Sequence, residues 1–215
     1  MVELCNTIQK DGNLTSYNYA FQNWNLNWLK YLKYKDLSSI KYFTSCFQNT
    51  IGKIDLTQFF EENGIIFNTS NATSLMQAFQ GSEVVRIPTI NTRKASSLTQ
   101  IFFSCPNLIT VDKLILKDDG SQSVTNFINN CPKLENITIE GVIGGAFNTN
   151  ATRLSRDSIL SILQSLQVTG KTVRIGLSKF CIDGTVDTLT TIQNDTELNT
   201  AYTTAISNGY TIAFA

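Results

Sequence analysis

The chain has 215 residues, of which 42% are hydrophobic and only 16% are charged. This length fits one domain with a substantial core. The 17 basic and 17 acidic side chains cancel, and no long run of either sign occurs, so nucleic acid and anionic lipid are not expected partners. The absence of histidine excludes Ser-His and Cys-His nucleophile pairs. The five cysteines never fall in a C-x-x-C spacing, so a zinc site is not expected. No P-loop or dinucleotide fingerprint occurs, so no cofactor is expected either.

The N-terminal region is predicted to be an end cap. Trp24, Trp28, Leu29 and Leu32 recur there at helical spacing, and a cap covers the open end that stacked repeats leave. The alternative is a binding platform in which Trp24, Trp28 and Tyr31 contact a glycan, a partner protein or another copy of the chain. The region shows no export signal, and no segment approaches 18 apolar residues, so we expect no membrane insertion.

An internal repeat is read from the spacing of apolar residues. Leu98 is followed by Phe102, Cys105, Leu108 and Val111. The same offsets recur at Val124, Ile128, Cys131, Leu134 and Ile137. A third copy is read from Leu75, Phe79 and Ser82. Two degenerate copies lie upstream, one at Tyr17 and one at Ile40, Phe43 and Cys46. The spacing from Leu98 to Phe102 and Cys105 follows the period of a helix, whereas the segment from Leu108 onward approaches the period of two that is typical of a strand. Each unit is therefore predicted to be a short helix, a turn and a short strand, stacked into an α/β solenoid with one curved sheet and helices on its other face.

The cysteines of the two Cys-Pro pairs are predicted to be structural. Cys105 and Cys131 hold the position that Ser82 holds in the copy upstream, so this position requires a small residue that faces the core. The proline that follows each cysteine ends the predicted helix. A reactive thiol needs an exposed, electropositive setting, and nothing nearby supplies one.

Polar residues at alternate strand positions predict an outward face that could recognise a glycan or a protein. The candidate contact residues on this face are Arg86, Asp112, Asn136, Thr138, Glu140 and Arg174. The alternative is that they are the ordinary polar residues of exposed strands. No catalytic residue is expected, because the neighbouring acids Asp118 and Asp119, and Glu61 and Glu62, are typical of solvated turns. A glycoside hydrolase that uses carboxylates alone is the least favoured function.

The C-terminal region is predicted to hold two helix-strand units. Ser155 is a suitable N-cap for an apolar-faced helix, and a strand follows at 172–177. A second helix stops at Asn208 and Gly209 before a terminal strand at 210–214. These units are expected to extend the same sheet.

The pattern S-L-x-x-x-F-x-x-C-P-x-L-x-x-V/I resembles the BspA-like class of leucine-rich repeats over roughly residues 37–140. The resemblance implies a single domain 1–215 that consists of a cap at 1–36, irregular repeats at 37–145 and closing units at 146–215. The segments LSRDSILSIL and NGYTIA are similar to the ends of leucine-rich-repeat proteins encoded by bacteriophages and gut bacteria.

This resemblance implies a non-enzymatic binding or assembly protein. The expected setting is a bacteriophage virion, where a tail, baseplate or receptor-binding protein assembles in the host cytoplasm and contacts a host-surface glycan or protein, or another virion protein. The alternatives are a bacterial cell-surface adhesin and a protein-interaction scaffold. A homo-oligomer is compatible with each of these functions.

Overall fold

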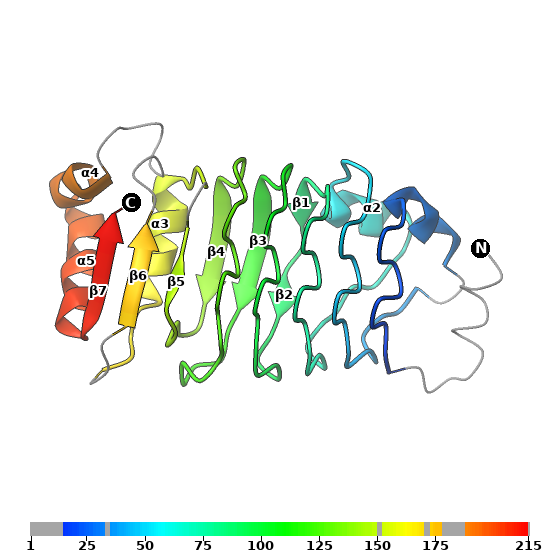
Figure 1. Ribbon diagram of the computed structural model, residues 1–215, viewed down its shortest axis with the longest axis horizontal. Coiled ribbons are helices and arrows are strands. Elements are labelled where there is room, and N and C mark those ends of the chain that lie inside the picture. The colour runs from blue at the N-terminus through cyan, green and yellow to red at the C-terminus, as the bar shows by residue number, and fades with distance from the viewer. Residues whose placement is uncertain (1–14, 33–34, 150–151, 170–172, 178–187, 215) are drawn as a thin grey trace.

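The computed structural model describes residues 15–32, 35–149, 152–169, 173–177 and 188–214. Figure 1 shows an elongated stack in which the chain advances from an N-terminal to a C-terminal end, with helices toward both ends. In chain order the elements are η1 (Leu26–Tyr31), α2 (Leu56–Glu62), β1 (Arg86–Ile87), β2 (Ile90–Asn91), β3 (Thr110–Ile115), β4 (Asn136–Glu140), β5 (Phe147–Asn148), α3 (Arg156–Gln164), β6 (Val173–Leu177), α4 (Thr188–Asn194), α5 (Thr196–Ser207) and β7 (Tyr210–Phe214). The fold is mixed α/β, as predicted. None of the described helices is long and apolar enough to cross a membrane.

The described strands form two parallel sheets, so the prediction of a single sheet was wrong. In the first sheet β3 pairs with β4 on one side and with β1 and β2 on the other, and in the second the order is β5-β6-β7. The first sheet ends at β4 because α3 lies against its edge. The N–H groups of Ile137 and Ile139 donate to the hydroxyls of Ser158 (2.8 Å) and Ser161 (2.7 Å) on α3. A helix thus satisfies the donors that a further strand would have paired.

The predicted helices of the repeated units are β-turns instead. Five turn segments, at 18–23, 44–49, 76–81, 99–104 and 125–130, stack along the molecule. Each contains two residues with positive φ, four positions apart: Tyr19 and Asn23, Ser45 and Asn49, Gln77 and Gly81, Gln100 and Ser104, Asn126 and Asn130. A right-handed helix cannot contain such residues. A positive φ at the third residue is typical of type II turns.

Hydrogen bonds between neighbouring turn segments explain why turns replace helices. The N–H of Phe47 donates to the carbonyl of Ala78 (2.7 Å), that of Phe79 to Ile101 (2.9 Å) and that of Phe102 to Phe127 (2.9 Å). Alternate N–H groups therefore donate to carbonyls of the next segment. The N–H groups between them donate within their own segment to the carbonyl three residues earlier, as Gln80 does to Gln77 at 3.1 Å. Both conformations bury the same apolar positions, so the apolar spacing alone could not distinguish them.

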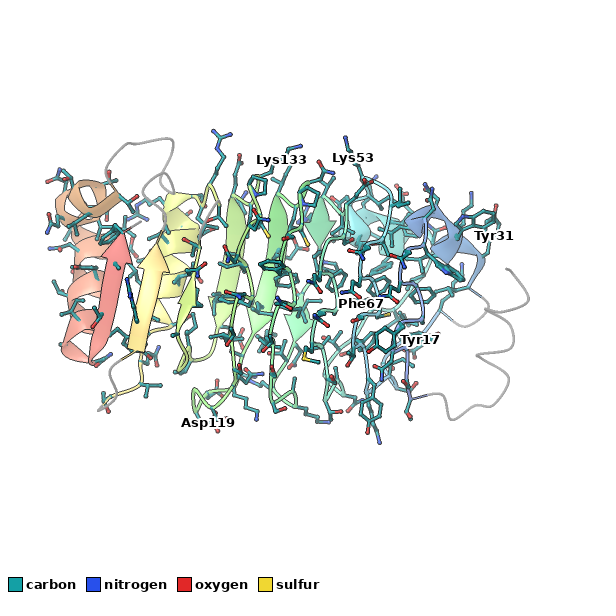
Figure 2. All side chains as sticks on the ribbon, in the orientation of Figure 1. Tyr17, Tyr31, Lys53, Phe67, Asp119 and Lys133 are labelled. Carbon is teal, nitrogen blue, oxygen red and sulfur yellow. The ribbon has the colours of Figure 1, made fainter. Side chains whose placement is uncertain are left out.

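A column of phenylalanine rings runs through the stacked turn segments. The ring centroids of Phe21 and Phe47 lie 5.4 Å apart, those of Phe47 and Phe79 5.1 Å, and those of Phe79 and Phe102 5.9 Å. Phe67, labelled in Figure 2, packs edge-on against this column at 6.5 Å from Phe79. The column corrects the register of the second copy, because Phe47 rather than Phe43 is aligned with Phe21 and Phe79.

The two Cys-Pro cysteines are buried, as predicted. Cys105 and Cys131 are both 0% exposed. Their thiols donate across the stack to the carbonyls of Phe79 and Phe102, each at 2.9 Å. Burial raises the pKa of the Cys105 thiol well above its usual value, which disfavours the reactive thiolate. Both cysteines are therefore parts of the packing between turn segments.

We expect Cys105 and Cys131 to resist alkylation by iodoacetamide in the native protein at neutral pH and to react fully in denaturant. The reason is that the thiol must both leave the core and ionise before it can attack. Site-resolved mass spectrometry is the suitable measurement, because it separates these positions from Cys5 and Cys181, which lie outside the described residues. Rapid modification of either thiol in the folded state would contradict a packing role.

Candidate functional site

A β-bulge in β3 changes the outward face that the sequence predicts. Val111 aligns with Ile137 and Leu114 with Ile139, so β3 has one residue more than β4 between these pairs. Val111 and Leu114 are buried, whereas Asp112 and its neighbour Lys113 are both partly exposed. A bulge of this kind turns two successive side chains outward. Strict alternation along the strand had identified Asp112 and missed Lys113.

One cluster of charges on this face is centred on Arg86. Its Nε donates to the carboxylate of Asp112 at 2.5 Å, and its Nη1 lies 3.9 Å from the carboxylate of Asp55. Thr57 donates its hydroxyl to the second oxygen of Asp112 at 2.9 Å. The hydrogen bond and charge of Asp112 raise the pKa of Arg86. The structure therefore brings together two of the predicted site residues, and they bind each other.

A second cluster lies at the other end of the strands, where Arg93 follows β2 and reaches residues of β4 and of the segment after β3. The Nη2 of Arg93 lies 3.1 Å from Asp118 and 3.2 Å from Glu140. Lys113 also reaches Glu140, at 3.2 Å. The charged side chains are between 41% and 74% exposed, so these ion pairs contribute little stability. Their effect is to neutralise the charges of this face and to hold them in place.

The remaining predicted strand residues are exposed but lie apart from these ion pairs. Asn136 accepts a hydrogen bond from the hydroxyl of Ser155 at 3.2 Å. Thr138 lies in the same strand with an exposed side chain. The face over β3 and β4 therefore combines paired charges with hydrogen-bonding side chains, which is a rigid and nearly neutral surface.

The N-terminal aromatic residues fall into two groups, one that fits the predicted end cap and one that fits the predicted binding surface. Trp24 is partly buried and packs edge to face on Phe21 at 5.6 Å. Trp28 and Tyr31, by contrast, are 43% and 53% exposed, and their ring centroids lie 5.9 Å apart. Figure 2 shows Tyr31 at the outer end of the stack. Trp24 is thus part of the cap, and Trp28 and Tyr31, which we call the aromatic pair, form a surface.

The helix type explains this division. The segment η1 is a 3-10 helix with three residues per turn, so residues three apart share a face. Leu26, Leu29 and the following Leu32 are buried on one face, and the aromatic pair shares another. The sequence prediction assigned Trp24, Trp28, Leu29 and Leu32, at helical spacing, to one face that covers the end of the stack. That prediction was wrong for Trp28.

Arg174 lies far from both features, in the second sheet. It lines a cavity of about 360 Å³ together with Thr125, Asn126, Ala146, Phe147, Asn148, Gly176 and Ala213. Its side chain is exposed. The predicted site residues therefore do not form one site, because the aromatic pair, the paired charges and Arg174 occupy successive places along the stack.

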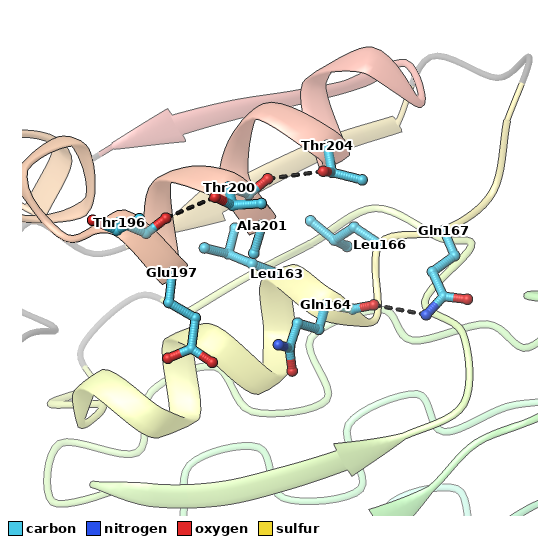
Figure 3. Close-up of a pocket in the computed structure, with 9 residues that line it drawn as sticks. All are labelled: Leu163, Gln164, Leu166, Gln167, Thr196, Glu197, Thr200, Ala201 and Thr204. Atoms are coloured by element: carbon cyan, nitrogen blue, oxygen red, sulfur yellow. Dashed lines mark hydrogen bonds between the residues drawn. The ribbon is translucent and has the colours of Figure 1, made fainter.

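A groove between α3 and α5 has a volume of about 600 Å³. Figure 3 shows the residues that line it. Leu163, Leu166 and Ala201 line it. The hydroxyls of Thr200 and Thr204 donate to carbonyls of their own helix at 2.7 and 2.8 Å, which leaves the groove mainly apolar.

Arg156 of α3 forms ion pairs with acidic residues at the start of α5. It donates to both oxygens of Asp195, at 2.8 and 2.9 Å, and to Glu197 at 2.9 Å. The hydrogen bonds from Arg156 lower the pKa of Asp195 to about 2. Asp195 is also the N-cap of α5, with its carboxylate accepting from the N–H of Leu198 at 3.0 Å. This ion pair therefore fixes α5 relative to α3.

The acidic pairs considered for hydrolysis occupy ordinary positions. Asp118 pairs with Arg93, and Asp119 accepts from the N–H of Ser121 at 2.9 Å in a turn, which lowers its pKa. Glu62 accepts from Gln58 within α2. In the part of the chain that the structure describes, no three Cys, Asp or Glu residues are grouped in a way that could hold a metal ion.

Comparison with known proteins identifies no family for the chain. No protein-family model matches it, no curated protein matches it and no solved structure matches it. Its function is therefore inferred from the surface features described above.

Proposed function

We propose that the protein is a non-enzymatic binding and assembly module, built as a leucine-rich-repeat solenoid of the BspA-like type. The five turn segments support this architecture. All five share one length and a positive φ at the same two positions, and each of the first four donates backbone hydrogen bonds to the next segment. Stacked units of this kind present extended surfaces that suit recognition.

The exposure of the aromatic pair is the main observation that supports a binding role. Trp28 and Tyr31 are exposed side by side, and the buried leucines of η1 hold their backbone in place. Lys30 adds a cation 5.0 Å from the Tyr31 ring centroid. Tryptophan and tyrosine supply large contact areas at low entropic cost and dominate many interfaces. We propose that this surface contacts a host-surface glycan in a bacteriophage tail, baseplate or receptor-binding protein, with a bacterial cell-surface adhesin as the alternative setting.

Binding of another virion protein is the second candidate function. Ile51 is 54% exposed and forms a backbone bridge with Asn25, the N-cap residue of η1. An exposed aliphatic side chain in the segment that pairs with the N-cap of η1 suits a protein partner better than a sugar, because it offers contact area without hydrogen bonds.

A glycan array, run beside light scattering, tests the proposal. We expect the wild-type protein to bind one glycan class and Trp28→Ala to reduce its affinity by about tenfold or more, as is usual for a central aromatic contact. Tyr42→Ala is the matched control, because Tyr42 is also 43% exposed but lies outside the aromatic pair. Equal binding by Trp28→Ala and the wild type would contradict the proposed role. A defined oligomer without glycan binding would favour the assembly function.

A further inference from the structure

The cavity at Arg174 is formed where three strands and a turn segment meet. Asn148 of β5 aligns with Gly176 of β6, which aligns with Ala213 of β7. Arg174 precedes Gly176 by two residues in β6, so the side chain of Arg174 lies on the sheet face that a side chain at position 176 would share. Thr125 and its neighbour Asn126, at the start of the last turn segment, complete the lining. These residues come from four separate parts of the chain.

Small residues keep this cavity open. A Cβ at Gly176 would lie 3.0 Å from the Cβ of Asn148, which is closer than such atoms normally approach. Ala213 and Ala146 add only methyl groups. A larger side chain at any of these three lining positions would reduce the volume of the cavity. The volume of about 360 Å³ is in the range of small-molecule sites.

The charge of Arg174 is the feature that identifies a ligand class. Arg86, Arg93 and Arg156 each pair with a carboxylate, at 2.5, 3.1 and 2.8 Å respectively. Arg174 forms no ion pair with any residue that the structure describes. The other polar residues of the lining, Thr125, Asn126 and Asn148, are uncharged. Among the lining residues that the structure describes, Arg174 therefore supplies the one positive charge, beside neutral hydrogen-bonding groups.

We infer that this cavity binds an acidic monosaccharide, with Arg174 pairing with its carboxylate. A guanidinium matches a carboxylate through two parallel hydrogen bonds. One positive charge balances the single charge of a carboxylate, whereas a phosphate carries up to two. The side-chain amide of Asn126 and the hydroxyl of Thr125 both donate and accept, as sugar hydroxyls require. This site is separate from the aromatic pair and goes beyond the proposed function.

Saturation-transfer NMR and calorimetry with D-glucuronate test this inference. We expect the wild-type protein to bind glucuronate with a dissociation constant of about a millimolar, and D-glucose and inorganic phosphate at least about tenfold more weakly. Arg174→Gln should weaken glucuronate binding by about tenfold or more, because it removes the charge and keeps an amide. Arg153→Gln is the matched control, since Arg153 is exposed but does not line the cavity.

Gly176→Val provides a second, steric variant that leaves Arg174 in place. It should also abolish glucuronate binding, and thermal unfolding of each variant verifies that the fold is retained. Equal glucuronate affinity in the wild type and Arg174→Gln would overturn the inference, as would stronger binding of phosphate than of glucuronate. Trp28→Ala should bind glucuronate normally, so failure of this inference and failure of the proposed function give different results.

Discussion

Phe79→Ala should destabilise the protein by about 3–5 kcal/mol, which is the usual cost of truncating a fully buried phenylalanine. The ring is 0% exposed and lies between Phe47, at 5.1 Å, and Phe102, at 5.9 Å. Its removal leaves a void between rings from separate turn segments, and the backbone hydrogen bonds between these segments prevent the stack from closing over it. Urea unfolding followed by far-UV circular dichroism measures the free energy of unfolding.

Met76→Ala is the control for this substitution. Met76 lies in the same turn segment but is 40% exposed, so its truncation should change the free energy of unfolding by no more than about 0.5 kcal/mol. If the two variants had similar stability, the phenylalanine column would not hold the turn segments together.

Gly144→Ala should be the second strongly destabilising change, at about 1–3 kcal/mol. A Cβ at this position would overlap the carbonyl oxygen of Gly120, which belongs to the backbone of the connection after β3. Backbone atoms cannot rotate away as a side chain can, so one of the two connections must move. Gly120 belongs to the connection from β3 to β4, and Gly144 belongs to the connection from β4 to β5. We therefore expect a lower unfolding midpoint in the same urea experiment.

Gly145→Ala is the neighbouring control. Its Cβ would lie 3.2 Å from the Val124 methyl group Cγ2, which is a tight contact with a side chain that can adjust. We expect Gly145→Ala to be clearly more stable than Gly144→Ala. The opposite order would show that the close approach of Gly120 and Gly144 is not a constraint on the fold.

The binding surfaces could be predicted only in part from the sequence. Trp28, Tyr31 and Arg174 were identified by residue type and position, and all three are exposed. The mutual pairing of Arg86 with Asp112, and of Lys113 with Glu140, could not be foreseen. It depends on the bulge in β3 and on the register between strands, and neither follows from the local pattern of one strand.

The sequence by itself determined many of the buried residues and the start of one helix. Apolar side chains must leave water whatever the backbone does, so Phe102, Cys105 and Cys131 could be placed in the core, and Ser155 could be recognised as the N-cap of α3. Only the tertiary structure decided that turns replace the repeated helices and that α3 ends the first sheet. Both outcomes arise from hydrogen bonds between residues more than 20 positions apart, such as Phe79 to Ile101 and Ile137 to Ser158. The stacking of neighbouring segments, rather than local propensity, selects the partners of these backbone groups.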